Sequence, residues 1–121
     1  MKKTIGQLLR TVQFLAVLLL CACSPDDFQV ESADLDGTWY ASDGFYYIFN
    51  ADASGRCQDA DGYGLDFNWE LNDKELTLNY IQNGSIPKPA KEIYHITEFS
   101  ADMMEAHEIA FPDESVRFYK Q

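Results

Sequence analysis

The strongest constraint in this chain is a strict alternation of apolar and polar side chains over residues 65–71. Every odd position is apolar and every even position is polar, which is the period of a β-strand with one buried face. The turn residues Asn72, Asp73 and Lys74 follow, and residues 76–80 then resume the alternation. The sequence therefore predicts a β-hairpin whose odd-numbered first-strand residues face a core.

Six further segments are short, bounded by turn residues and compatible with strands, whereas no long window has the apolar spacing of a helix. These predicted strands are residues 38–41, 45–50, 56–59, 92–99, 103–109 and 115–119. Residues 82–90 contain Asn83-Gly84, Pro87 and Pro89, which predict a loop. A last turn is expected at residues 111–114.

Eight short strands with turns every eight to twelve residues indicate an antiparallel barrel or sandwich. Closure into a barrel removes the unpaired edges, so we predict an all-β fold: a small antiparallel up-and-down β-barrel in residues 35–121. Such a barrel is either filled by its side chains or holds one small ligand. The large inward candidates are Trp39, Tyr47, Phe49, Phe67, Trp69 and Tyr80.

A Gly-x-Trp pattern, Gly37 to Trp39, opens the first predicted strand. This pattern, the aromatic strand after it and the hairpin of residues 65–80 resemble the lipocalin and calycin barrels, and in particular small lipocalin-like lipoproteins of bacterial envelopes. The resemblance covers residues 35–121 and implies that Trp39 packs across a closed barrel end. The chain lacks the Thr-Asp-Tyr motif of full lipocalins, and no C-terminal helix is expected after its last strand.

The six aromatic candidates have two interpretations. They line a pocket for a small apolar ligand, or they only form the core. A cavity of roughly 300 Å³ or more would favour a ligand carrier. A solid interior with an exposed apolar patch at residues 81–86 would instead favour a protein-interaction module, such as an inhibitor or accessory subunit of an envelope complex, with residues 82–90 and the acidic surface contacting the partner.

Residues 1–22 combine a basic start, a short apolar run and small residues near their end. These features indicate a secretory signal, because the run is too short and too interrupted for the roughly 20 apolar residues of a membrane-spanning helix. The run ends in Leu20-Cys21-Ala22-Cys23, which resembles the lipobox of bacterial lipoproteins. The resemblance implies that Cys23 is lipidated and that it anchors the protein at the outer membrane. The anchored domain would then face either the periplasm or the cell exterior.

Residues 23–34 are polar and acidic, and they predict a tether between the anchor and the barrel. All 20 acidic residues of the chain follow residue 22, whereas three of the nine basic residues precede it. The resulting acidic surface argues against nucleic-acid binding, because phosphate contacts need lysine and arginine. It also repels anionic lipid, so membrane contact is expected through the acyl chains.

No residue pattern predicts catalysis or a cofactor. Cys57 lies in a predicted strand, where a buried and inert thiol is expected. Pairs of carboxylates occur, but 20 acids place such pairs by chance, and neither a nucleophile–base pair nor a cofactor motif accompanies them. We expect a protein that is not an enzyme.

Two segments carry metal-ligand residue types. Residues 50–61 match part of a calcium loop, but the strands that flank it favour a hairpin turn. His95 and His107 lie on consecutive predicted strands and could face each other, with Glu92, Glu105 and Glu108 close in sequence. Without a third ligand of known orientation, a surface cross-strand pair is the favoured interpretation, and no metal site is predicted.

Overall fold

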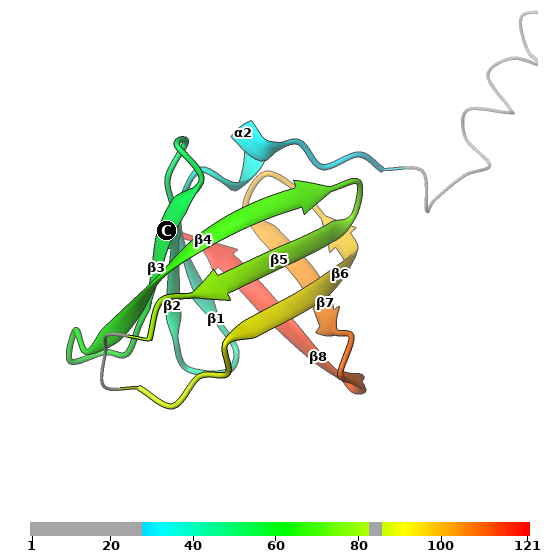
Figure 1. Cartoon of the computed structure of the whole chain (residues 1–121). Helices are drawn as coiled ribbons and strands as arrows, with labels where there is room; N and C mark the ends of the chain where they lie inside the picture. Colours follow the sequence, from blue (N-terminus) through cyan, green and yellow to red (C-terminus); the bar gives the residue numbers. More distant parts are fainter. Residues whose placement is uncertain (1–27, 83–85) are drawn as a thin grey trace, which may run out of the picture.

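The computed structural model describes residues 28–82 and 86–121; the expected signal, residues 1–22, and Cys23 lie outside this part. Eight antiparallel strands form a closed barrel in sequence order, and β1 also pairs with β8 (Figure 1). A short helix, α2 (Ser32–Leu35), precedes them. The strands are β1 (Gly37–Ala41), β2 (Tyr46–Phe49), β3 (Ser54–Gln58), β4 (Gly64–Asn72), β5 (Glu75–Tyr80), β6 (Lys91–Phe99), β7 (Met103–Glu108) and β8 (Phe111–Lys120). The predicted all-β up-and-down barrel is confirmed.

The hairpin predicted from residues 65–80 is formed by β4 and β5. Phe67 pairs with Tyr80, and Trp69 pairs with Leu78. Burial alternates along β4 from Leu65 to Trp69, with the odd positions inside the barrel. The apolar period of this segment therefore sets both its strand register and the face that it buries.

Several buried aromatic rings pack against one another inside the barrel. The Phe49 ring lies 5.5 Å from the Phe67 ring and 5.4 Å from the Trp69 ring, and Phe67 lies 5.6 Å from Tyr80, measured between centroids. Gly55 pairs with Phe67 across the strands, and the absence of a side chain at Gly55 leaves room for the Phe67 ring. A Cβ atom at position 55 would lie only 2.2 Å from Phe67 Cε1. Each buried ring stabilises the fold by about 1.5–3 kcal/mol, and tilted or edge-on contacts add about 0.5–1.5 kcal/mol.

Residues just before β1 close one end of the barrel. Val30 and Leu35 are buried, and the Trp39 indole N–H donates a 2.9 Å hydrogen bond to the Leu35 carbonyl. The Lys120 ammonium lies 4.7 Å from the centre of the Trp39 ring and donates to the Asp36 carbonyl. The described part of the expected tether is thus part of the folded domain. Within the described residues, α2 is too short to cross a membrane, and no other helix has the length and apolar character to do so.

The last hairpin differs from its sequence prediction. A turn was expected at residues 111–114, but the chain turns at Ile109 and Ala110, and β8 already begins at Phe111. Phe111 pairs with Glu108, whereas Ser115 pairs with His107, so the intervening β8 residues form a bulge. This bulge accommodates Pro112, because proline has no N–H to donate to the sheet.

Candidate functional site: a buried lysine at one end of the barrel

The end of the barrel opposite α2 contains a buried lysine. Lys88 lies in the segment between β5 and β6, and its side chain is only 7 % exposed. Its ammonium lies among three aromatic rings, 4.7 Å from the centre of Phe45, 5.3 Å from Tyr47 and 5.9 Å from Tyr80. The negative faces of these rings favour a cation, so they offset part of the cost of removing the ammonium from water.

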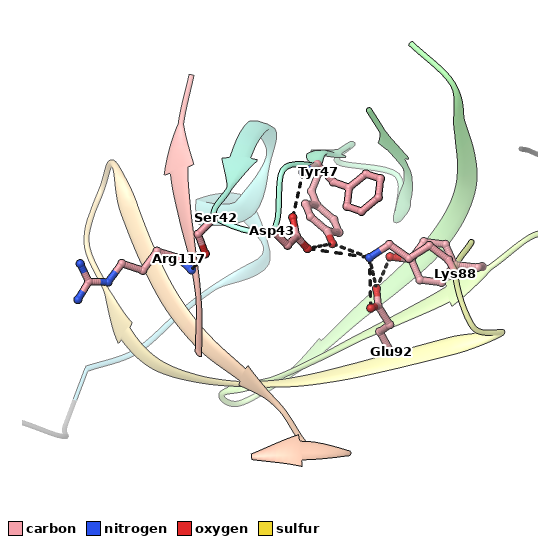
Figure 2. Close-up of polar contacts among 8 residues, drawn as sticks. Ser42, Asp43, Tyr47, Lys88, Glu92 and Arg117 are labelled. Atoms are coloured by element: carbon pink, nitrogen blue, oxygen red, sulfur yellow. Dashed lines mark hydrogen bonds and ion pairs between the residues drawn. The ribbon is translucent and has the colours of Figure 1, made fainter. Parts of the chain in front are cut away.

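Two carboxylates and a phenol complete the surroundings of the ammonium (Figure 2). Lys88 Nζ lies 3.3 Å and 3.4 Å from the Glu92 carboxylate oxygens and 4.0 Å from Asp43 Oδ2, and it donates a 2.9 Å hydrogen bond to Tyr47 Oη. Tyr47 in turn donates to Asp43 Oδ2 at 2.7 Å, and Tyr80 donates to Glu92. These five residues form one continuous polar network, called the Lys88 network below.

Each carboxylate of the Lys88 network is positioned by local structure. Asp43 lies in the turn between β1 and β2, where its Oδ1 accepts a 2.9 Å hydrogen bond from the Phe45 N–H. Glu92 lies on β6, two and four residues before the inward residues Tyr94 and Ile96. The period of two that places those residues inside also places Glu92 inside, so the sequence held a signal for its burial.

The buried tyrosine phenols and the Cys57 thiol near the Lys88 network stay protonated and neutral. Burial is the largest cause that raises the pKa values of Tyr47, Tyr80 and Tyr94 far above the ordinary tyrosine value, and the Glu92 carboxylate also raises those of Tyr80 and Tyr94. Burial likewise raises the pKa of the Cys57 thiol to about 11. At neutral pH the phenols therefore act as hydrogen-bond donors, and the buried Cys57 thiol is protonated.

The six aromatic residues predicted to line a pocket are all buried, but they divide into three groups. Tyr47 and Tyr80 belong to the Lys88 network, and Trp39 lies at the opposite end against Leu35. In the remaining group, the Phe49 ring contacts both Phe67 and Trp69, and the Trp69 indole N–H donates to the Asn50 and Ser54 carbonyls at the β2–β3 turn. Sequence reasoning identified all six as inward residues but did not find Lys88, Glu92 and Asp43.

The segment proposed as a calcium-loop alternative forms two separate turns. β3 divides residues 50–61, and Asp52 accepts hydrogen bonds from the backbone N–H and the hydroxyl of Ser54 at 3.0 Å and 2.6 Å. The hairpin turn expected at this position is confirmed.

The two histidines pair across β6 and β7, as the sequence allowed. His95 is the register partner of His107, and their ring centroids are 5.4 Å apart. Glu92 points into the barrel and is separated from them, while Glu105 accepts a 2.8 Å charged hydrogen bond from Arg117. Among residues 28–82 and 86–121, no three metal-ligating side chains gather in one place.

Comparisons of the chain with protein-family models, with curated proteins and with solved structures found no match in any of the three. The closed eight-stranded barrel is consistent with the lipocalin-like fold suggested by Gly37 and Trp39.

Replacement of Lys88 by methionine should destabilise the fold by about 3–5 kcal/mol, because the buried Glu92 carboxylate loses its cation. Addition of Glu92→Gln should recover most of this loss, since the uncharged amide needs no cation. Urea unfolding of both variants measures the effect. The matched control is Arg56→Met, which breaks the exposed Arg56–Asp66 pair and should cost less than about 1 kcal/mol. A Lys88→Met loss no larger than that of the control would contradict the role of the network.

The raised pKa values also predict alkaline unfolding. Groups that stay neutral in the fold contribute stability that is fully present below their unfolded pKa, about 8.5 for cysteine and about 10 for tyrosine. This contribution is lost as the pH rises past those values, because only the unfolded chain can then ionise Cys57, Tyr47, Tyr80 and Tyr94 freely. Urea midpoints should be level between pH 7 and pH 8 and should fall steeply above about pH 9.5. Part of the tyrosine absorbance change at high pH should appear only with unfolding; complete ionisation of a still-folded chain would contradict the account.

Proposed function

We propose that this protein is a lipid-anchored lipoprotein of the bacterial cell envelope whose barrel is a non-enzymatic protein-interaction module, an inhibitor or accessory subunit of an envelope complex. The observation that carries the proposal is the filled interior of the barrel. A module of this kind presents its binding surface on the outside, and its inner residues serve stability.

The alternative function is that of a carrier for a small apolar ligand. No observation of the barrel interior specifically supports it. Phe49, Phe67 and Trp69 are buried inside the barrel, and the Phe49 ring contacts the other two. Lys88 occupies one end and is held by an ion pair with Glu92. An apolar ligand would have to separate the rings, and an entry through that end would break a buried ion pair, at a cost of several kcal/mol.

The outer surface carries a row of aromatic side chains that suits protein contact. Four side chains follow one line across neighbouring strands, because each is the register partner of the next. They are Tyr46 on β2, Tyr40 on β1, Tyr119 on β8 and Met103 on β7. Tyr40 and Tyr119 are 39 % and 43 % exposed, and the Tyr40 and Tyr46 rings lie 4.8 Å apart. Tyrosine and methionine are enriched at protein interfaces. This tyrosine row is the proposed contact surface.

The loop after β5 contributes less apolar surface than the sequence suggested. Ile81 is 45 % exposed, but Ile86 is buried against the core, and residues 83–85 lie outside the described residues. The acidic character of the chain, with a formal net charge of −11, favours a partner whose contact face carries lysine and arginine. The tyrosine row supplies the apolar centre of the proposed interface, and the negative net charge of the chain attracts a basic partner toward it.

The anchor part of the proposal rests on Cys23 in the lipobox-like segment. Cys23→Ala should abolish incorporation of a labelled fatty acid and should release the protein from the membrane fraction, because the acylated thiol is lost. Cys21→Ala, two residues away, is the control and should leave labelling unchanged. Labelling that persists in Cys23→Ala would refute the assignment.

The interaction surface can be tested by site-specific photocrosslinking in the native host. A benzophenone amino acid at Tyr40 or Tyr119 should form an adduct with the same envelope protein, and one at Asn68 should not, because Asn68 is exposed on β4, on the other side of the barrel. The adduct should weaken when the other tyrosine of the row is changed to glutamate. Absence of adducts from the row, together with a stoichiometric small molecule on the purified protein in native mass spectrometry, would favour the ligand carrier instead.

A further inference from the structure

We infer that His95 and His107 form a binding site for a divalent late transition-metal ion, of the class of Zn²⁺ and Cu²⁺, on the outer face of β6 and β7. The two residues are register partners on antiparallel strands, so their side chains leave the sheet side by side on one face. That face is the outer one, because Tyr94 and Ile96 on either side of His95 are buried inside the barrel. The chain contains only these two histidines.

The distance between the rings matches the geometry of a shared ion. In a zinc site the metal lies about 2.0–2.1 Å from each imidazole nitrogen, so the ring centroid lies about 3.2 Å from the metal. Two imidazoles at a tetrahedral angle on one ion then have centroids about 5.2 Å apart. The observed separation is 5.4 Å, and the rings are tilted by 46° rather than stacked face to face. Small rotations of the two side chains would bring both rings onto one ion.

The surroundings of the pair favour a cation. Across the strands, His95 pairs with Glu75 on β5, and His107 pairs with Ser115 on β8. The two histidines therefore have a carboxylate on one side and a hydroxyl on the other. None of the four paired residues in this row is a lysine or an arginine. Two cationic side chains near this row have other contacts. Lys74 places its ammonium 4.2 Å from the centre of the Phe28 ring, and Arg117 binds Glu105. The negative charge of the whole chain raises the local concentration of cations further.

The donor set selects the class of ion. Imidazole nitrogen suits Cu²⁺, Ni²⁺ and Zn²⁺, whereas Mg²⁺ and Ca²⁺ prefer oxygen ligands. No third ligating side chain gathers with the pair within the described residues, so water or a group from another molecule completes the coordination. A bound ion would connect β6 to β7 and would stabilise the folded chain, because the unfolded chain does not hold the two rings together.

Zinc titration of the processed chain, acylated at Cys23 and purified in detergent with a tag that contains no histidine, tests the site. Calorimetry should detect one saturable Zn²⁺ site per chain and no Mg²⁺ binding. His95→Asn and His107→Asn should each weaken zinc binding by about tenfold or more, since a two-ligand chelate needs both rings. Ser115→Asn, an exposed change in the same row, is the matched control and should keep the original affinity.

Thermal unfolding supplies a second readout and a check of folding. Without metal, both histidine variants should keep the melting temperature of the original chain, because neither ring is part of the core. Zinc should raise the melting temperature of the original chain and of Ser115→Asn, but not of either histidine variant. Zinc binding that survives both variants, or that depends on only one histidine, would overturn the inference without affecting the tyrosine row.

Discussion

The stability of this fold depends on filling the inside of a closed eight-stranded barrel. A barrel of this size is wide enough for side chains or for one small ligand, but an empty interior would forfeit the packing contacts that stabilise it. Here large rings meet inside the barrel, where Phe49 contacts both Phe67 and Trp69. The choice of aromatic residues for the inward positions therefore decides both the stability of the barrel and where it can bind another molecule.

Two lysines close the ends of the barrel in related ways. Lys88 places its ammonium among aromatic rings and beside Glu92 at one end, and Lys120 places its ammonium over Trp39 at the other. A buried ion pair is costly to desolvate and gains its stability from good geometry and complete hydrogen bonding. Two phenols complete the hydrogen bonding of the Lys88 network: Tyr47 donates to Asp43, and Tyr80 donates to Glu92. The acidic chain thus buries one lysine, Lys88, in its interior and places a second, partly exposed one, Lys120, against the buried Trp39.

The parts that sequence predicts well are those with a strict period. The alternation over residues 65–71 predicted the central hairpin, and the buried Tyr94 and Ile96 occupy alternate positions of the predicted strand 92–99 in the same way. The sequence did not predict the burial of Lys88, because its loop carries two prolines and no period that orients a side chain. The last turn was misplaced for a similar reason: Pro112 usually marks a turn, but a bulge accommodates it within β8.

The central claim, that the chain's own side chains fill the barrel, is tested most directly by methyl NMR with an apolar probe. The methyl groups of Leu78, Ile96 and Met104 lie inside the barrel, and all three residues are completely buried. Titration with N-phenyl-1-naphthylamine should leave their resonances in place and should give no contacts between probe and methyl protons. Saturable shifts of these resonances, with probe-to-methyl contacts, would contradict the account and would show that the barrel opens to admit a ligand.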